Sequence, residues 1–151
     1  MKASEMMTRD PKTCEPNHDL ACCIRIMREE DTGIVPVTEA NGEARVVGVV
    51  TDRDIALALG ERDATPSGCS VGDVMKKDVV SVNPDADVRD VSRRMQEAQV
   101  RRILVVEDGR LVGIISTADL ARASAHKDGR LREEVESIIE KVSEEGGSAR
   151  A

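Results

Sequence analysis

The chain has 151 residues, of which 40% are hydrophobic and none is Phe, Tyr or Trp, and its formal net charge is −7. An acidic chain without aromatic side chains is poorly suited to nucleic acid, because phosphates attract surplus Lys and Arg and single-stranded bases stack on aromatic rings. No apolar run approaches the roughly 18 residues of a membrane helix, and the N-terminus is too polar for a signal peptide. We therefore expect a cytoplasmic protein with reduced cysteines and no membrane contact.

An internal repeat organises the chain. Residues 46–59, VVGVVTDRDIALAL, and residues 111–124, LVGIISTADLARAS, are identical at five of 14 aligned positions. Such a repeat predicts two similar units, which should pack on each other because about 60 residues bury too little surface alone. The predicted divisions are repeat 1 over 1–62, a linker over 63–70, repeat 2 over 71–127, an amphipathic helix over 128–145 and a flexible tail over 146–151.

Each repeat is predicted to contain a helix, two strands and a second helix. The first helix follows a Pro, with Asn17 or Asp85 as its N-cap. Its apolar stripe is Leu20, Cys23, Ile24 and Met27 in repeat 1, and Val88, Val91 and Met95 in repeat 2, where Ser92 interrupts it. The runs GIVPV and RILVV predict buried strands, and EDGR predicts a hairpin turn. After the last strand, DRDIALALG and TADLARASA predict the second helix. The predicted C-terminal helix places Leu131, Val135, Ile138 and Val142 on one face.

A polar pattern recurs where the last strand of each repeat meets the second helix: Gly, two apolar residues, Thr or Ser, two variable residues, then Asp. Thr51 with Asp54, and Ser116 with Asp119, fit a helix capping box. A helix N-terminus also favours anions, and a carboxylate can accept from the two neighbouring hydroxyls of a ribose. The two roles can coexist, and both interpretations stay open.

Taken together, the pattern resembles the CBS domain, and the two repeats resemble a CBS pair, or Bateman module. The resemblance covers about residues 3–125. It rests on MMTRDPKTCEPNHDL and DVMKKDVVSVNPDADV at the repeat starts, on IVPV and RRILVV, and on VVGVVTDRDI and LVGIISTADL. It implies an α+β fold of tandem β-α-β-β-α repeats packed as a pseudo-two-fold pair. Two clefts between the units would bind an adenosyl ligand such as AMP, ADP, ATP or S-adenosylmethionine.

The resemblance also implies site residues. Asp54 and Asp119 would hold the ribose, with Thr51 and Ser116 near ribose and phosphate. Residues entering the second strand of the opposite unit would line the adenine: Thr32, Gly33 and Ile34 for one cleft, and Val100, Arg101 and Arg102 for the other.

The charges beside the two motifs differ. Arg53 lies within TDRD of repeat 1, Ala118 takes that place in repeat 2, and Arg101 and Arg102 supply cations there instead. Arginine suits bidentate phosphate contact, although each of these arginines can also be a solvated surface charge. We expect unequal clefts, with tighter phosphate binding where Arg102 joins Ser116 and Asp119.

Cys14, His18, Cys22 and Cys23 crowd one short segment. Their spacing matches none of the standard zinc patterns, and Cys23 lies on the apolar stripe, where a free Cys behaves as a small hydrophobe. We therefore predict no metal site here, although His18 and Cys22 lie one helical turn apart.

The expected function is regulatory and not enzymatic, since the sequence has no Gly-rich phosphate loop and no Ser-His-Asp arrangement. His126 is interpreted as a helix-end residue. The module would take an adenosyl compound as regulatory ligand with no obligatory cofactor, form a homodimer and signal to a protein partner in trans. Two alternatives remain: a structural interaction module with empty clefts, and a Cys/His metal or thiol sensor.

Overall fold

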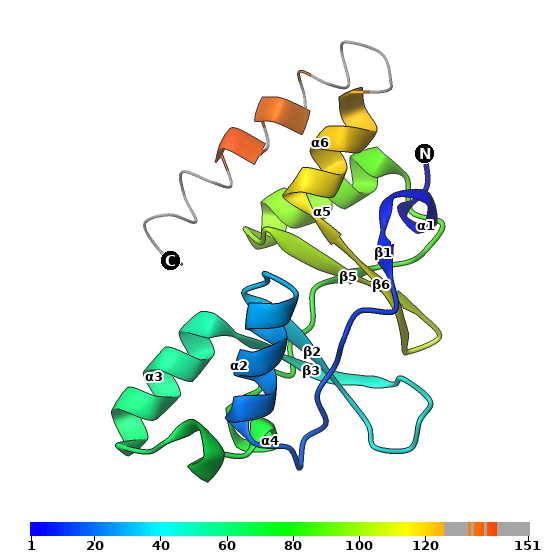
Figure 1. Cartoon of the computed structure of the whole chain (residues 1–151). Coiled ribbons are helices and arrows are strands. Elements are labelled where there is room, and N and C mark those ends of the chain that lie inside the picture. Colours follow the sequence, from blue (N-terminus) through cyan, green and yellow to red (C-terminus); the bar gives the residue numbers. More distant parts are fainter. Residues whose placement is uncertain (126–132, 134, 138, 142–151) are drawn as a thin grey trace. The chain divides into compact units, whose positions relative to one another are not determined.

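The structure is a computed structural model that describes residues 1–125, 133, 135–137 and 139–141 (Figure 1). The predicted helix over 128–145 is therefore seen only in part: its described residues are helical, and Val135 is buried. Leu131, Ile138, Val142, His126 and the predicted tail lie outside the described residues. No helix in the described part of the chain is long and apolar enough to cross a membrane.

The chain forms two compact α+β units, each with its own hydrophobic core. The first-repeat unit comprises residues 11–79 and 108–111. The second-repeat unit comprises residues 1–10, 80–107 and the described residues from 112 onward. The compact units therefore differ from the sequence repeats, because the start of each repeat folds with the other repeat.

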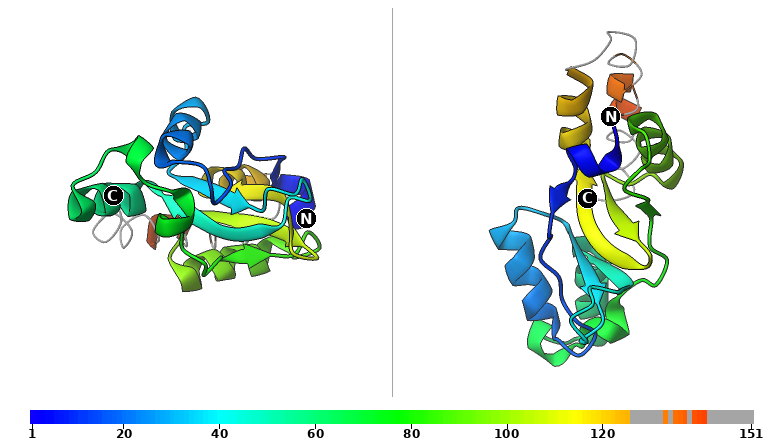
Figure 2. Two further views of the ribbon diagram at one scale, coloured as in Figure 1. Left: turned by 90° about the horizontal axis from the view of Figure 1, so that it is seen from below. Right: turned by 90° about the vertical axis from the view of Figure 1, so that its right-hand side faces the viewer.

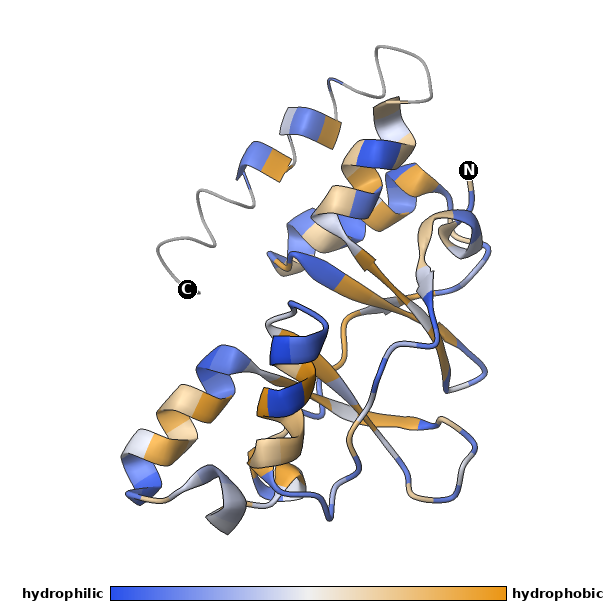
Figure 3. Ribbon diagram, in the orientation of Figure 1, coloured by the Kyte–Doolittle hydropathy of each residue, from blue (hydrophilic) through white to orange (hydrophobic). Residues whose placement is uncertain are grey.

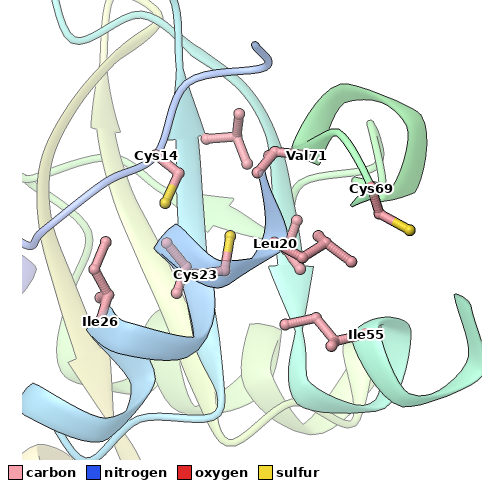
Figure 4. Close-up of a cluster of buried hydrophobic side chains, with 10 residues drawn as sticks. Cys14, Leu20, Cys23, Ile26, Ile55, Cys69 and Val71 are labelled. Carbon is pink, nitrogen blue, oxygen red and sulfur yellow. The ribbon is translucent and has the colours of Figure 1, made fainter. Parts of the chain in front are cut away.

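In the first-repeat unit, β2 (Ile34–Thr38) and β3 (Val46–Thr51) form an antiparallel pair. Single bridges extend this pair on both sides, from Cys14 parallel to Val37 and from Lys76 antiparallel to Val49. The helices are α2 (Leu20–Glu29), α3 (Asp52–Arg62) and α4 (Val71–Val74), with the 3-10 turn η1 (Pro66–Gly68). The core contains Cys14, Leu20, Cys23, Ile26, Val35, Val37, Val50, Ile55, Cys69 and Val71 (Figure 4).

The predicted linker over 63–70 is packed against this unit. The backbone N–H of Leu20 donates to the carbonyl of Cys69 at 3.0 Å, and the N–H of Val71 donates to the carbonyl of His18 at 2.8 Å. Cys69 is only 3% exposed. The Gly, Pro and Ser residues at 66–68 form the turn η1 within this segment.

In the second-repeat unit, four strands are hydrogen-bonded in the order β1-β6-β5-β4. These are β1 (Thr8–Arg9), β6 (Arg110–Ser116), β5 (Arg102–Glu107) and β4 (Ser81–Val82). The helices are α1 (Ala3–Met6), α5 (Val88–Ala98) and α6 (Thr117–Ala125). The views of Figures 1 and 2 show α5 and α6 side by side, and both contribute residues to one core with β5 and β6. Asp108 and Gly109 have φ of 50° and 78°, which confirms the predicted hairpin turn between β5 and β6.

Two details of the first helix in each repeat differ from the prediction. The N-caps are Asp19 and Asp87, not Asn17 and Asp85, because the residues after each Pro first form a turn, closed in repeat 1 by the N–H of His18 donating to the carbonyl of Glu15. Ser92 does not interrupt the apolar stripe of α5. It is 1% exposed, and its hydroxyl donates to the Val88 carbonyl at 2.9 Å, so it is accepted inside the core. Figure 3 shows the resulting hydrophobic and hydrophilic sides of the helices.

One edge of each sheet is formed by the start of the other repeat. Thr8 pairs with Ile114 in the second-repeat unit, and Lys76 pairs with Val49 in the first-repeat unit. The glycine of each motif lies under this edge. A Cβ on Gly48 would lie 2.7 Å from the Lys76 carbonyl oxygen, and a Cβ on Gly113 would collide with the Met7 side chain. The repeated glycine is therefore required by close packing.

Candidate ligand-binding motifs at two helix starts

The first motif caps α3. The Thr51 Oγ1 accepts from the Asp54 N–H at 3.1 Å, and the Asp54 Oδ2 accepts from the Thr51 N–H at 2.9 Å. The other Asp54 oxygen lies 3.1 Å from the Lys76 Nζ, and the Asp54 side chain is only 9% exposed. The capping-box interpretation is confirmed here, with an ion pair added to it.

The second motif caps α6 with more contacts. The Ser116 Oγ accepts from the Asp119 N–H at 3.2 Å and donates to the Asp119 Oδ2 at 3.0 Å. The Asp119 Oδ2 also accepts from the Ser116 N–H at 2.8 Å. The Asp119 Oδ1 is paired with the Arg122 guanidinium. This motif is also a capping box, and its carboxylate is more fully used.

In each unit the loop that precedes β2 or β5 lies beside the motif of that unit. The N–H of Asp52, next to Thr51, donates to the Gly33 carbonyl at 3.0 Å. At the matching place, the N–H of Thr117 donates to the Arg101 carbonyl at 3.0 Å. Within each unit the loop thus lies beside the motif of the same unit, whereas the resemblance assigns the adenine-lining loop to the opposite unit. The two groups are Thr32, Gly33, Ile34, Thr51, Arg53 and Asp54; and Val100, Arg101, Arg102, Ser116 and Asp119.

These loops are ordered by local contacts. The Thr32 hydroxyl donates to the Ile34 carbonyl at 3.1 Å, and Ile34 pairs with Thr51 across the β2–β3 hairpin. The Val100 N–H donates to the Met95 carbonyl at 3.1 Å, and its side chain packs against the core. Arg53 and Arg101 are exposed, and Arg102 is half-buried.

Sequence reasoning missed the two cations that face the motif carboxylates. Arg122 lies three residues after Asp119 on α6, and such i,i+3 pairs of opposite charge interact on a helix surface, so its spacing could have revealed it. Lys76 lies far from Asp54 in sequence. It reaches the carboxylate because the start of repeat 2 pairs with β3. No local sequence pattern predicts the contact between Lys76 and Asp54.

The two carboxylates differ in the acceptor positions they have left. A carboxylate offers about four lone-pair positions. Asp119 uses three of them, for the Ser116 N–H, the Ser116 hydroxyl and Arg122, which leaves about one. Asp54 uses two, for the Thr51 N–H and Lys76, which leaves about two. By this count Asp54 has more acceptor capacity left than Asp119.

The cysteine segment lies at and before the start of α2. Cys14, His18 and Cys22 bring their ligand atoms within 4.8 Å of one another, and Cys23 lies in the core as expected. A side-chain hydrogen bond with Cys23, and then burial, raise the pKa of the Cys14 thiol. Burial raises the pKa of the Cys22 thiol to about 12.

Comparison with known proteins places these features in a family. The family model of the CBS domain matches residues 3–61 and 71–126. The CBS domain-containing protein YhcV of Bacillus subtilis is 36% identical over 120 residues, which are 78% of this chain and 81% of that protein. The crystal structure of hypoxic response protein I with two coordinated zinc ions has a TM-score of 0.73 and 29% identity, covering 85% of this chain and 100% of the other. The structure of CBSX2 in complex with AMP has a TM-score of 0.70 and 27% identity, covering 82% of this chain and 96% of the other. The chain belongs to the CBS domain family, with one CBS domain in each of its two repeats.

Proposed function

We propose that this protein is a regulatory module, without catalytic activity, that binds an adenosyl ligand at the Thr51–Asp54 and Ser116–Asp119 motifs. The observation that carries the proposal is the duplicated motif itself. In each unit a nearly buried carboxylate at a helix N-terminus keeps acceptor capacity beyond its cap. A ribose hydroxyl is a donor of the kind such a carboxylate takes. The AMP complex of the related CBSX2 supports the adenosyl class.

The residues beside each motif have proposed roles. Thr32, Gly33 and Ile34, and likewise Val100, Arg101 and Arg102, line the base, while Arg53 and Arg102 approach the phosphates. The base would lie between aliphatic side chains, since the chain has no aromatic ones. The ligand acts as a regulatory signal, passed to a protein partner in trans by a homodimer in the cytoplasm.

The test of ligand class is a thermal shift assay with adenosine, AMP, ADP, ATP and S-adenosylmethionine. A compound that binds only the folded state raises the melting temperature by mass action. No shift at millimolar concentration with any of them would favour a structural module with empty clefts.

Single substitutions test the site. Asp54→Ala and Asp119→Ala should each weaken binding of the active compound by about 1.5–3 kcal/mol, the scale of a hydrogen bond to a charged group. Asp90→Ala is the matched control, because Asp90 forms the same kind of i,i+3 pair, with Arg93, outside both motifs. Calorimetric affinities equal to those of the unmodified protein in both motif variants would reduce the two aspartates to helix caps.

The proposed role of the arginines is tested with ligands that carry different numbers of phosphates. Arg102→Ala should reduce affinity for ATP more than for adenosine, by roughly 1–3 kcal/mol if the contact is direct. Arg53→Ala should likewise reduce affinity for ATP more than for adenosine, at the Thr51–Asp54 motif. Titrations with adenosine, AMP and ATP measure this. Equal losses for all three ligands would show that Arg102 supports the fold and does not contact phosphate.

A further inference from the structure

A second group of side chains lies outside the two motifs, at the start of α2. Its members are Cys14, from the segment before the helix, His18, just before the N-cap, and Cys22, in the first turn. The Cys14 and Cys22 Sγ atoms are 2.6 Å apart, and the His18 Nδ1 is 3.7 Å from the Cys22 Sγ. Cys14 is fully buried, while the His18 side chain is 43% exposed. The cluster therefore has a closed side formed by the core and an open side toward solvent.

Backbone hydrogen bonds hold all three residues in place. Cys14 is paired with β2, since its N–H donates to the Pro36 carbonyl at 3.1 Å and its carbonyl accepts from the Thr38 N–H at 2.9 Å. The Cys22 N–H donates to the N-cap Asp19 at 3.3 Å. The His18 carbonyl accepts from the Val71 N–H, as described above. These bonds fix the backbone positions from which the three side chains converge.

Glu15 contacts both nitrogens of the His18 imidazole and so orients the ring. Its Nε2 lies 3.5 Å from the Glu15 Oε2, while its Nδ1 faces Cys22 and accepts from the Glu15 N–H at 3.1 Å. An Nδ1 acceptor requires the proton on Nε2, the ring nitrogen nearer the carboxylate. Histidines that bind metals commonly donate their second ring N–H to a carboxylate. On binding a cation, Nδ1 would exchange the Glu15 N–H for the metal.

We propose that Cys14, His18 and Cys22 form a three-ligand site for Zn²⁺. Two thiolate sulfurs and one imidazole nitrogen are a preferred ligand set of this ion, and each thiol releases its proton to solvent as it binds the metal. Three protein ligands leave the fourth tetrahedral position to water or to a small ligand from outside.

The site needs one local adjustment. Two sulfurs on a tetrahedral Zn²⁺, each about 2.3 Å from the ion, are separated by about 3.7 Å, so Cys22 must move by about 1 Å. Cys22 is partly buried on the first helical turn and packs against the core, so a turn of its side chain is the movement required. The rival chemistry is a Cys14–Cys22 disulfide. A disulfide gives no role to His18 and Glu15, and this is why we favour the metal.

The experiment uses the full chain, purified under reducing conditions and stripped of metal with a chelator. Zinc titration against a competing chelator should show one bound ion per chain, and Co²⁺ should give the absorption bands of tetrahedral cobalt–thiolate coordination. His18→Gln and Cys22→Ser should weaken Zn²⁺ binding by more than the roughly 10–100-fold typical of outer-shell partners, and Glu15→Gln by about that amount. The Glu15→Gln variant should keep the cobalt–thiolate bands, because it retains all three ligands.

Cys69→Ala is the matched control, since Cys69 lies in the same core but outside the cluster. It should bind Zn²⁺ as the unmodified protein does. His18 and Cys22 are not fully buried, so their variants should keep the fold, which urea unfolding without metal verifies. Three results would overturn the proposal: substoichiometric zinc in the reduced protein, unchanged zinc affinity in both ligand variants, or a Cys14–Cys22 disulfide in a protein that takes up no zinc after reduction.

Discussion

The first-repeat and second-repeat units build the same helix cap but neutralise its aspartate differently. Asp119 is paired with Arg122 of its own helix, whereas Asp54 is paired with Lys76, which comes from the start of the other repeat. Ser116 also donates its hydroxyl proton to Asp119, a contact that has no described counterpart at Thr51. The duplicated motif therefore produces one nearly saturated carboxylate and one with more acceptor capacity. Similar sequence at a site does not ensure similar binding chemistry.

The largest expected difference between the units concerns their motif glycines. Gly48→Ala places a Cβ against the Lys76 carbonyl, whose backbone is held by two hydrogen bonds with Val49, at 2.8 and 2.9 Å. Gly113→Ala places it against Met7, whose Sδ and Cγ can turn away, while its Cβ at 3.0 Å stays in place. Both should lower the free energy of unfolding by an amount within about 1–3 kcal/mol, with Gly48→Ala at the upper end. Urea unfolding measures both.

The control for these substitutions is Gly60→Ala. Gly60 lies in α3, and an added Cβ meets no atom within 4 Å. Alanine there should raise the free energy of unfolding by about 0.5–1 kcal/mol, because glycine is a poor helix residue. Equal destabilisation by Gly48→Ala and Gly113→Ala would show that the Met7 side chain is as immobile as the Lys76 backbone.

The next effect concerns the cap hydroxyls. Loss of an N-cap hydroxyl lowers the free energy of unfolding by about 0.5–2 kcal/mol. Ser116→Ala should lower the free energy of unfolding more than Thr51→Ala does, because Ser116 both accepts from the Asp119 N–H and donates to the Asp119 carboxylate. Ser116→Thr, which copies the first motif, should retain most of the stability. A larger loss for Thr51→Ala in urea unfolding would contradict the contacts described for the two caps.

The smallest effects on stability concern the two cations. Lys76 and Arg122 are 54% and 73% exposed in their side chains, so each ion pair should stabilise the fold by only about 0.2–1 kcal/mol. Under the proposed function, ligand affinity separates them. Arg122→Ala frees an acceptor position on Asp119 and should strengthen adenosine binding, whereas Lys76→Ala should change it less, because Asp54 already has positions left. Adenosine is the suitable probe, since it carries no phosphate that either cation could attract. Weaker adenosine binding in Arg122→Ala would show that Arg122 positions the carboxylate for the ligand.

The sequence by itself determined the features that depend on neighbouring residues. The strand–turn–strand of repeat 2 follows from Asp108 and Gly109, and the cap of each second helix follows from a hydroxyl and an Asp three residues apart. These contacts close within one or two turns of the chain, so short patterns specify them. The same reasoning placed the first N-caps two residues too early, because a turn after Pro16 competes with the helix for the same residues.

Only the tertiary structure decided which distant segments meet. The pairing of Lys76 with Val49 supplies the cation of Asp54, and the pairing of Cys14 with β2 brings its sulfur to Cys22 and His18. The spacing of Cys14, His18 and Cys22 matches no standard zinc pattern, because such patterns describe ligands held by a local loop. Here a single bridge to β2 and the start of a helix position the three residues, and burial of the surrounding aliphatic side chains fixes that arrangement.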